Sequence, residues 1–166
     1  MPKITVIAHN IRSTHNVGAI FRTCEGFGVE KIILSGYTPY PRIPNDSRLP
    51  HIAEKLTNQI HKTALGAEDL VPFEYFEDIE DWFRLNQQTD SLPLIALEQA
   101  PNSVKLPEFD PPEKMALILG EEVHGIEQSL LKSCQAAVEI PMHGQKESFN
   151  VSVACGIALY GLSQEA

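Results

Sequence analysis

The sequence predicts an α/β domain built on a mostly parallel sheet that is flanked by helices. The main observation is that short apolar runs typical of strands alternate along the chain with segments of helical spacing. The second observation is the length of 166 residues, which suits one domain with a sizeable core. Because no linker or internal repeat divides the chain, we expect residues 1–166 to form a single domain.

The N-terminal residues predict a strand, a helix and a second strand in that order. Residues 3–8 and 31–34 are apolar runs bounded by turn-forming residues, as expected of strands. Residues 17–27 have helical spacing, and Gly26 and Gly28 are positioned to end that helix. This order indicates a βαβ unit.

The same pattern continues to the C-terminus. We expect further strands at residues 70–73, 93–97, 115–119 and 136–140, and helices at residues 79–85, 126–134 and 150–162. The last helix has apolar residues on nearly every face, so it should be buried all round. The proline-rich stretches 36–50 and 100–112 predict loops.

Composition excludes several classes of protein. A chain that is 43% hydrophobic and 21% charged has the composition of a globular domain and not of a disordered one. The longest apolar run, around 115–119, is far shorter than the roughly 20 residues that span a bilayer, so we expect a cytoplasmic protein without a membrane partner. Cys24, Cys134 and Cys155 fit neither a disulfide framework nor a zinc site, and should be reduced and buried.

The charge is distributed unevenly along the chain. A net charge of −9 by itself argues against a nucleic-acid partner. Residues 1–62, however, hold eight of the thirteen Lys and Arg side chains against four acids, a balance of +4, and the remainder carries −13. The asymmetry supports a polyanion-binding face, although a solvated acidic surface is the commoner explanation. The tyrosines and arginines of the 36–50 stretch suit RNA binding by stacking and phosphate contact, and equally suit a flexible surface loop.

Three short segments point to a specific chemistry. They cover residues 10–29, which include Asn16 and Arg22, residues 117–126 around Gly120, and residues 140–154. In this order they resemble the three motifs of the SpoU family of RNA ribose 2′-O-methyltransferases, a trefoil-knotted class that uses S-adenosylmethionine. The resemblance covers essentially the whole chain, which is therefore expected to be a minimal catalytic domain with no appended RNA-binding domain. Methyl transfer to a hydroxyl needs no metal.

The resemblance assigns catalytic roles to five polar residues. These are Arg22, Asn16, Glu122, Ser148 and Asn150. A guanidinium has a pKa above about 12, so we expect Arg22 to bind phosphate and to polarise the 2′-oxygen instead of removing its proton. The ordinary alternatives are a surface Arg22 paired with Glu25 or Glu30, and helix caps for Asn16, Ser148 and Asn150.

The resemblance also places the cofactor and the RNA. The expected cofactor pocket is lined by Leu97, Leu119, Gly120, Ile140, Met142 and Phe149. Such a pocket suits the carboxyl edge of a parallel sheet, where ligands gather. Arg12, Arg42 and Arg48 are the expected RNA-binding residues. The chain departs from the family pattern at Ile11, where proline is frequent, at Glu121, where a small polar residue is common, and at Phe149, where leucine is usual.

The family resemblance further implies a C-terminal deep trefoil knot and a homodimer whose active site draws on both subunits. The implied partner is RNA, with tRNA favoured over rRNA, and an accessory protein that supplies RNA affinity is an open alternative. The sequence does not identify the modified nucleotide.

Three other functions compete with this interpretation. A hydrolase using Ser148 with His143 lacks a G-x-S-x-G elbow. A Rossmann dehydrogenase would need a third glycine after Gly26 and Gly28, which moreover lie at a helix end. The strongest alternative is a knotted RNA-binding or partner-binding protein that has lost methyl transfer, which the net charge of −9 favours.

Overall fold

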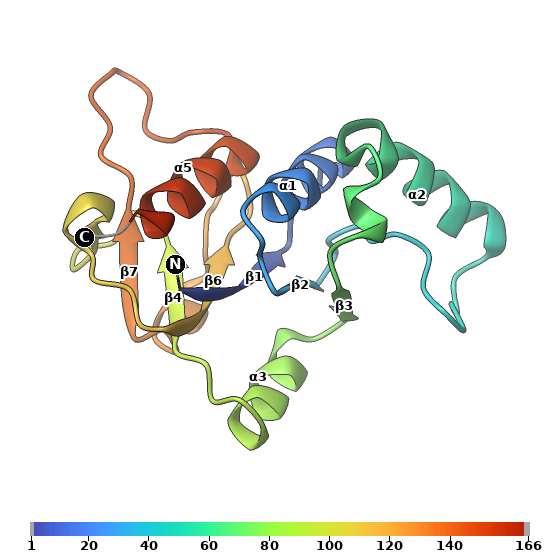
Figure 1. The fold of residues 1–166 in the computed structure, drawn as a ribbon, viewed down its shortest axis with the longest axis horizontal. Helices are drawn as coiled ribbons and strands as arrows, with labels where there is room; N and C mark the ends of the chain where they lie inside the picture. Colours follow the sequence, from blue (N-terminus) through green and yellow to red (C-terminus); the bar gives the residue numbers. More distant parts are fainter. Residues whose placement is uncertain (1, 165–166) are drawn as a thin grey trace.

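A seven-stranded parallel sheet forms the middle layer of the structure, a computed structural model that describes residues 2–164 (Figure 1). The strand order is β3-β2-β1-β6-β4-β7-β5, and every ladder between these neighbours is parallel. The strands are β1 (Lys3–His9), β2 (Lys31–Ser35), β3 (Phe73–Phe76), β4 (Leu94–Leu97), β5 (Val104–Lys105), β6 (Lys114–Leu119) and β7 (Ala136–Glu139). The predicted α/β class with a parallel sheet is confirmed.

Helices cover both faces of the sheet. They are α1 (Thr14–Gly26), α2 (Pro50–Ala64), α3 (Ile79–Gln88), α4 (Gln128–Leu131) and α5 (Val151–Ser163), with short 3-10 turns at Ala67–Asp69 and Leu106–Glu108. The helices α1, α2 and α5 lie along one face, and α3 lies beyond the other (Figure 1). Central strands therefore read as unbroken apolar runs, because both of their faces are buried.

Each face of the sheet has its own hydrophobic core. On β6, Leu117 packs into the core under α1, α2 and α5, whereas its neighbour Ile118 packs into the core under α3 and α4. On β1, Val6 belongs to the first of these cores and Ile7 to the second. This alternation follows from the two-residue period of a strand.

The structure corrects the predicted elements in four places. The stretch 100–112, predicted as a loop, contains the two-residue strand β5 (Val104–Lys105) and a 3-10 turn at Leu106–Glu108. The strand predicted at 70–73 lies at Phe73–Phe76, because residues 67–71 are wound into a helical turn in which the Val71 N–H donates to the Ala67 carbonyl. The helix predicted at 126–134 is reduced to Gln128–Leu131. Residues 50–64, which had no predicted structure, form α2, whose buried stripe of Ala53, Ile60 and Ala64 is narrow.

The C-terminal helix α5 is not buried all round within one chain. Cys155, Ala158 and Leu159 face the core, but Val153 is 49% exposed and Tyr160 is 60% exposed. The high apolar content of residues 150–162 predicts all-round burial, but apolar content alone does not distinguish a face in the core from an apolar face on the surface.

The three cysteines are free thiols, and their burial differs from the prediction at one position. Cys24 and Cys155 are buried, and Cys134 is half-buried. Burial raises the pKa of Cys24, and it raises the pKa of Cys134 to about 11, so these thiols stay protonated at neutral pH. Among residues 2–164 no helix is long and apolar enough to cross a membrane.

The parallel sheet brings distant parts of the chain to one edge. Residue Ala8 of β1 pairs with Leu119 of β6, and Leu119 pairs in turn with Leu97 of β4. All three strands therefore end at the same level. The segments that follow them emerge side by side, as expected for the ligand-binding edge of such a sheet.

We predict that Gly18→Ala destabilises the fold where α1 crosses α2. A β-carbon at Gly18 would lie 2.2 Å from both the Ile60 carbonyl oxygen and Thr63 Oγ1, so the helices would have to separate. The free energy of unfolding in urea should fall by about 1–3 kcal/mol. The control is Gly26→Ala in the same helix, where a β-carbon would contact nothing within 4 Å. Equal effects of the two substitutions would contradict this packing account.

Candidate active site

A cavity of about 350 Å³ opens at the carboxyl edge of the sheet. Its walls come from the ends of β4, β6 and β7 and from the segment that leads into α5. Eight of the residues selected from the sequence line it: Leu97, Leu119, Gly120, Glu122, Ile140, Met142, Ser148 and Phe149. All six expected cofactor residues thus surround one cavity.

The loop after β6 is a tight turn held by its own backbone. The Glu121 N–H donates to the Gly125 carbonyl at 3.1 Å, and the Gly125 N–H returns a bond to the Glu121 carbonyl at 2.8 Å. Gly125 has a positive φ of 70°, and a β-carbon at Gly120 would lie 2.6 Å from the Gly125 carbonyl carbon. Glycine is therefore needed at both positions for the turn to close.

A chain of side-chain hydrogen bonds joins the three sequence segments. Asn16 Nδ2 donates to Glu122 Oε1 at 3.1 Å, and Asn150 Nδ2 donates to Asn16 Oδ1 at 3.1 Å. The Arg12 N–H lies 3.4 Å from Glu122 Oε2. Asn16 therefore bridges α1, the turn after β6 and the start of α5.

Asn16 and Asn150 differ in whether they also cap a helix. Asn16 is not a cap: Ser13 caps α1 and accepts the Asn16 N–H at 3.2 Å. Asn150 does cap α5, because its Oδ1 accepts the Ser152 N–H at 3.0 Å while its Nδ2 reaches Asn16. Ser148 lies before the cap, on the cavity wall.

Glu121 has a buried carboxylate oxygen in need of a partner. Its side chain is only 8% exposed, and its Oε2 accepts the His124 N–H at 2.7 Å. Its Oε1 has no hydrogen-bond partner within residues 2–164, and Arg12 Nη2 lies 3.9 Å away. A buried oxygen in this state favours a ligand that brings a positive charge or an N–H group.

Further carboxylates give the cavity a negative potential. The acidic residues on its wall are Glu98, Glu121, Glu122, Glu139 and Glu147, and no Lys or Arg of the described chain lines it. Glu98 and Glu139 were missed as site residues. They stand at the ends of β4 and β7. Because ligands gather at the carboxyl edge of a parallel sheet, the reasoning that indicates Leu97 and Ile140 also indicates Glu98 and Glu139.

Arg22 lies apart from the cavity within a single chain. It is exposed on α1 and is not a lining residue. It forms no ion pair with Glu25 or Glu30, and Glu30 instead pairs with Lys3 at 3.3 Å. The surface ion pair considered as an alternative for Arg22 is therefore absent from the described structure.

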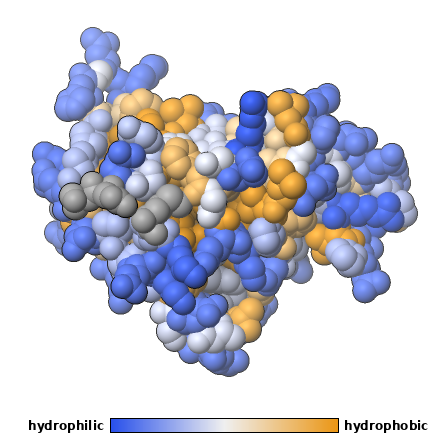
Figure 2. Space-filling model, viewed as in Figure 1, coloured by the Kyte–Doolittle hydropathy of each residue, from blue (hydrophilic) through white to orange (hydrophobic). Residues whose placement is uncertain are grey.

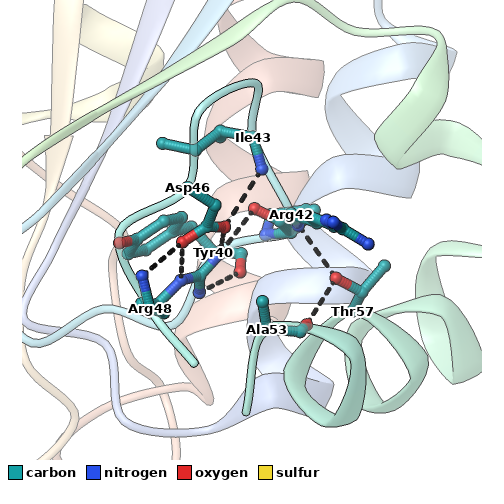
Figure 3. A network of polar contacts seen from close by, with 8 residues as sticks. Tyr40, Arg42, Ile43, Asp46, Arg48, Ala53 and Thr57 are labelled. Carbon is teal, nitrogen blue, oxygen red and sulfur yellow. Dashed lines mark hydrogen bonds and ion pairs between the residues drawn. The ribbon is translucent and has the colours of Figure 1, made fainter. Parts of the chain in front are cut away.

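The other predicted arginines differ in what they offer to a ligand. Arg48 is half-buried in a loop network, where it pairs with Asp46 and donates to the carbonyls of Tyr40 and Pro41 (Figure 3). Its hydrogen bonds hold the pKa of Asp46 well below the ordinary value. Arg42 contributes its backbone N–H to Thr57 Oγ1 at 2.8 Å and has an exposed side chain. Arg48 thus stabilises the 40–48 loop, whereas the side chains of Arg42 and Arg12 are exposed to solvent.

Comparisons with known proteins agree on one family. The model of the SpoU rRNA Methylase family matches residues 3–160. The chain is 28% identical to the 23S rRNA (guanosine-2′-O-)-methyltransferase RlmB of Coxiella burnetii, over 99% of this chain and 59% of that protein. It is also 28% identical to the tRNA (guanosine(18)-2′-O)-methyltransferase of Aquifex aeolicus, over 95% of this chain and 67% of that protein. The chain spans between half and two thirds of the length of most of these relatives.

Solved structures show the same fold. The AdoMet-bound rRNA methyltransferase from Sinorhizobium meliloti superposes with a TM-score of 0.79 at 24% identity, covering 96% of this chain and 55% of that one. A structure described as giving insights into the 2-OH methylation of C/U34 on tRNA superposes with a TM-score of 0.74 at 19% identity. It covers 97% of this chain and 94% of that chain.

We predict that Asp46→Asn weakens the 40–48 loop in a pH-dependent way. Because the folded pKa of Asp46 is lowered, its contribution to stability is complete above the unfolded pKa of about 3.9 and is lost as the pH falls toward the folded value. The variant should unfold at lower urea than the wild type at pH 7, with a smaller difference at pH 3. Asp110→Asn, at an exposed position, is the control. A pH-independent difference would refute the ion-pair explanation.

Proposed function

The chain belongs to the SpoU rRNA Methylase family, and from this we propose that it transfers a methyl group from S-adenosylmethionine to a ribose 2′-hydroxyl of RNA. The observation that carries the proposal is the Glu122–Asn16–Asn150 network at the rim of the carboxyl-edge cavity. Relatives named for rRNA and for tRNA both match, so both RNA classes are proposed substrates.

The cavity has the chemistry that S-adenosylmethionine requires. When bound, this group supplies an electrophilic methyl on a positively charged sulfur. Leu97, Leu119, Ile140 and Met142 offer apolar contact to an adenine. The carboxylates of the wall, and above all the unpartnered Glu121 Oε1, suit the positive charge of the donor.

The polar residues of the chain position the RNA. As the 2′-oxygen bonds the methyl carbon, its proton passes to solvent water, and S-adenosylhomocysteine is the leaving product. Glu122 bonds Asn16, and Asn16 in turn bonds Asn150, so these polar groups of the rim are already arranged without RNA. Ser148 contributes a hydroxyl on the wall. Arg22 binds a phosphate next to the target ribose and stabilises negative charge that develops on the 2′-oxygen.

We propose a homodimer with a trefoil knot, because the family resemblance implies both and because Arg22 lies apart from the cavity within a single chain. Val153 and Tyr160 give α5 an apolar outer surface, and Phe149, which precedes α5, is 42% exposed. Figure 2 shows hydrophobic surface on this face of the molecule, over the middle of the domain. We propose that a second copy packs here and that its Arg22 completes the site. The knot is proposed from the family resemblance of residues 117–154.

The proposed reaction is tested with the chain and S-adenosylmethionine that carries a deuterated methyl group. Unmodified rRNA and tRNA are the substrates. After the reaction the RNA is digested, and its nucleosides are identified by mass spectrometry. A labelled 2′-O-methylnucleoside is the expected product, and its base identifies the target. Binding of S-adenosylmethionine without any labelled product from either RNA would favour the catalytically inactive RNA-binding protein.

We predict that Arg22→Ala lowers kcat for methyl transfer by about 100-fold, because the developing charge on the 2′-oxygen loses a stabilising cation. The Kd for S-adenosylmethionine, measured by calorimetry, should change less than twofold. Arg84→Ala is the matched control, since Arg84 is an exposed arginine on α3 that pairs with Asp81. Parallel loss of methyl transfer and donor binding would assign Arg22 a structural role.

A shared site also predicts complementation between two inactive variants. A heterodimer of Arg22→Ala and Glu122→Gln chains holds one site in which both residues are native. Mixing the variants after mild unfolding and refolding should restore activity to on the order of a quarter of the wild type, the statistical share of intact sites in a two-fold dimer. A mixture as inactive as its components would show that each site uses its own Arg22.

A further inference from the structure

A second cavity, of about 520 Å³, lies between the turn after β2 and helix α2. Its walls include Tyr37, Tyr40, Arg12 and Arg48, and α2 contributes Leu56 and Gln59. We call it the tyrosine cleft. It adjoins the carboxyl-edge cavity through Arg12, which lines the cleft while its backbone N–H faces Glu122 and its guanidinium faces Glu121.

One wall of the tyrosine cleft is a preformed aromatic stack. The Tyr40 and Tyr75 rings are stacked with centroids 3.9 Å apart and planes 18° from parallel. The Arg48 guanidinium lies over Tyr40 at 3.5 Å and is held there by Asp46 (Figure 3). Tyr75 Oη donates to the Gly36 carbonyl at 2.7 Å, which ties the stack to the turn after β2. These contacts form the wall without a ligand.

The opposite part of the cleft presents an open aromatic ring. Tyr37 is 52% exposed, and its backbone N–H is fixed by Asn10 Oδ1 at 3.2 Å. The Arg12 guanidinium lies 5.6 Å from the Tyr37 ring centroid and is itself 69% exposed. An exposed ring beside an exposed guanidinium is the arrangement with which proteins stack a splayed base and contact its phosphate.

Charge separates the two cavities. The carboxyl-edge cavity is lined by five glutamates, whereas the tyrosine cleft is lined by two arginines and by none of the acidic residues of the described chain. A polyanion is repelled by the first, whereas in the second it meets the exposed guanidinium of Arg12, since Arg48 is already paired with Asp46. An RNA strand therefore reaches the target position most favourably from the side of the cleft.

We propose that the tyrosine cleft binds a nucleobase of the RNA strand next to the nucleotide that is methylated. The base stacks on Tyr37, and Arg12 contacts the phosphate between the two nucleotides. This inference rests on the proposed function for its choice of RNA as ligand. Tyr37 is thereby assigned to substrate binding, and Arg48 is assigned to supporting Tyr40 in the wall of the cleft.

The kinetic test compares Tyr37→Ala with Tyr37→Phe in the full chain with S-adenosylmethionine and the RNA that it methylates. Stacking of one base is usually worth about 5- to 100-fold in affinity, so KM for RNA should rise by that factor in Tyr37→Ala. Tyr37→Phe keeps the ring and should stay within about threefold of the wild type, as should kcat at saturating RNA and the Kd for S-adenosylmethionine in both variants. Leu85→Ala, on α3 beyond the other face of the sheet, is the control. An unchanged KM in Tyr37→Ala would overturn the proposal.

A binding test separates this proposal from the methyl transfer itself. The chain is labelled with ¹³C at tyrosine and titrated with hexauridylate, with hexaadenylate and with an abasic ribose-phosphate hexamer. The Tyr37 ring signal, assigned by its absence in Tyr37→Phe, should shift with both base-bearing oligomers and not with the abasic one. Equal shifts with all three would indicate a phosphate site only, and no shift would exclude RNA from the cleft; either result overturns the proposal.

The two tests also distinguish the ways of failing. A Tyr37 shift without any methylated nucleoside would leave the cleft standing and remove the proposed enzyme activity. Methylation with an unaltered KM in Tyr37→Ala would support the proposed enzyme activity and would exclude base binding in the tyrosine cleft.

Discussion

The parallel pairing of β1 with β6 is the constraint on which the candidate site depends. It sets Ala8 opposite Leu119, so the chain leaves both strands at the same level of the sheet. Asn16 and Glu122 are separated by 106 residues in sequence, yet they form a hydrogen bond of 3.1 Å because each follows one of these strands. Asn150 joins them from a third segment. The site is thus a consequence of strand order, and its members have no local tendency to associate.

The division of charge is compatible with the proposed action of an acidic protein on RNA. The net charge of −9 is concentrated beyond residue 62, and five glutamates line the cavity proposed for a positively charged methyl donor. Of the basic side chains of residues 1–62, Arg12 and Arg48 line the tyrosine cleft, and Lys55 and Lys62 lie on the adjoining helix α2. Arg12 lies between the two regions, with Glu121 on one side and Tyr37 on the other.

The sequence predicts best those features that are encoded by continuous apolar patterns. The strands at 115–119 and 31–34 are buried on both faces and agree with the structure to within a residue at each end. Helix α2 was missed because only Ala53, Ile60 and Ala64 are fully buried, and because Pro50 suggests a loop although it suits the first turn of a helix.

Polar contacts set by the tertiary path of the chain were beyond sequence reasoning. Ser13 and Asn16 are both good capping residues, and only the start of α1 at Thr14 decides that Ser13 is the cap and leaves Asn16 free. Arg48 resembles an RNA ligand in sequence, but the 40–48 loop folds it onto Asp46 and Tyr40. The position of Arg22 relative to the cavity likewise depends on packing that no local pattern describes.

The most direct test of this account is a double-mutant cycle between Asn16 and Glu122. The rate of methyl transfer at saturating S-adenosylmethionine would be measured for the wild type, Asn16→Ala, Glu122→Gln and the double variant. Because the two side chains act through one hydrogen bond, the account predicts that the double variant is little slower than the more damaging single variant, a coupling of about 1–3 kcal/mol. Effects that simply add would show that the two residues work independently, and would contradict a site assembled around their contact.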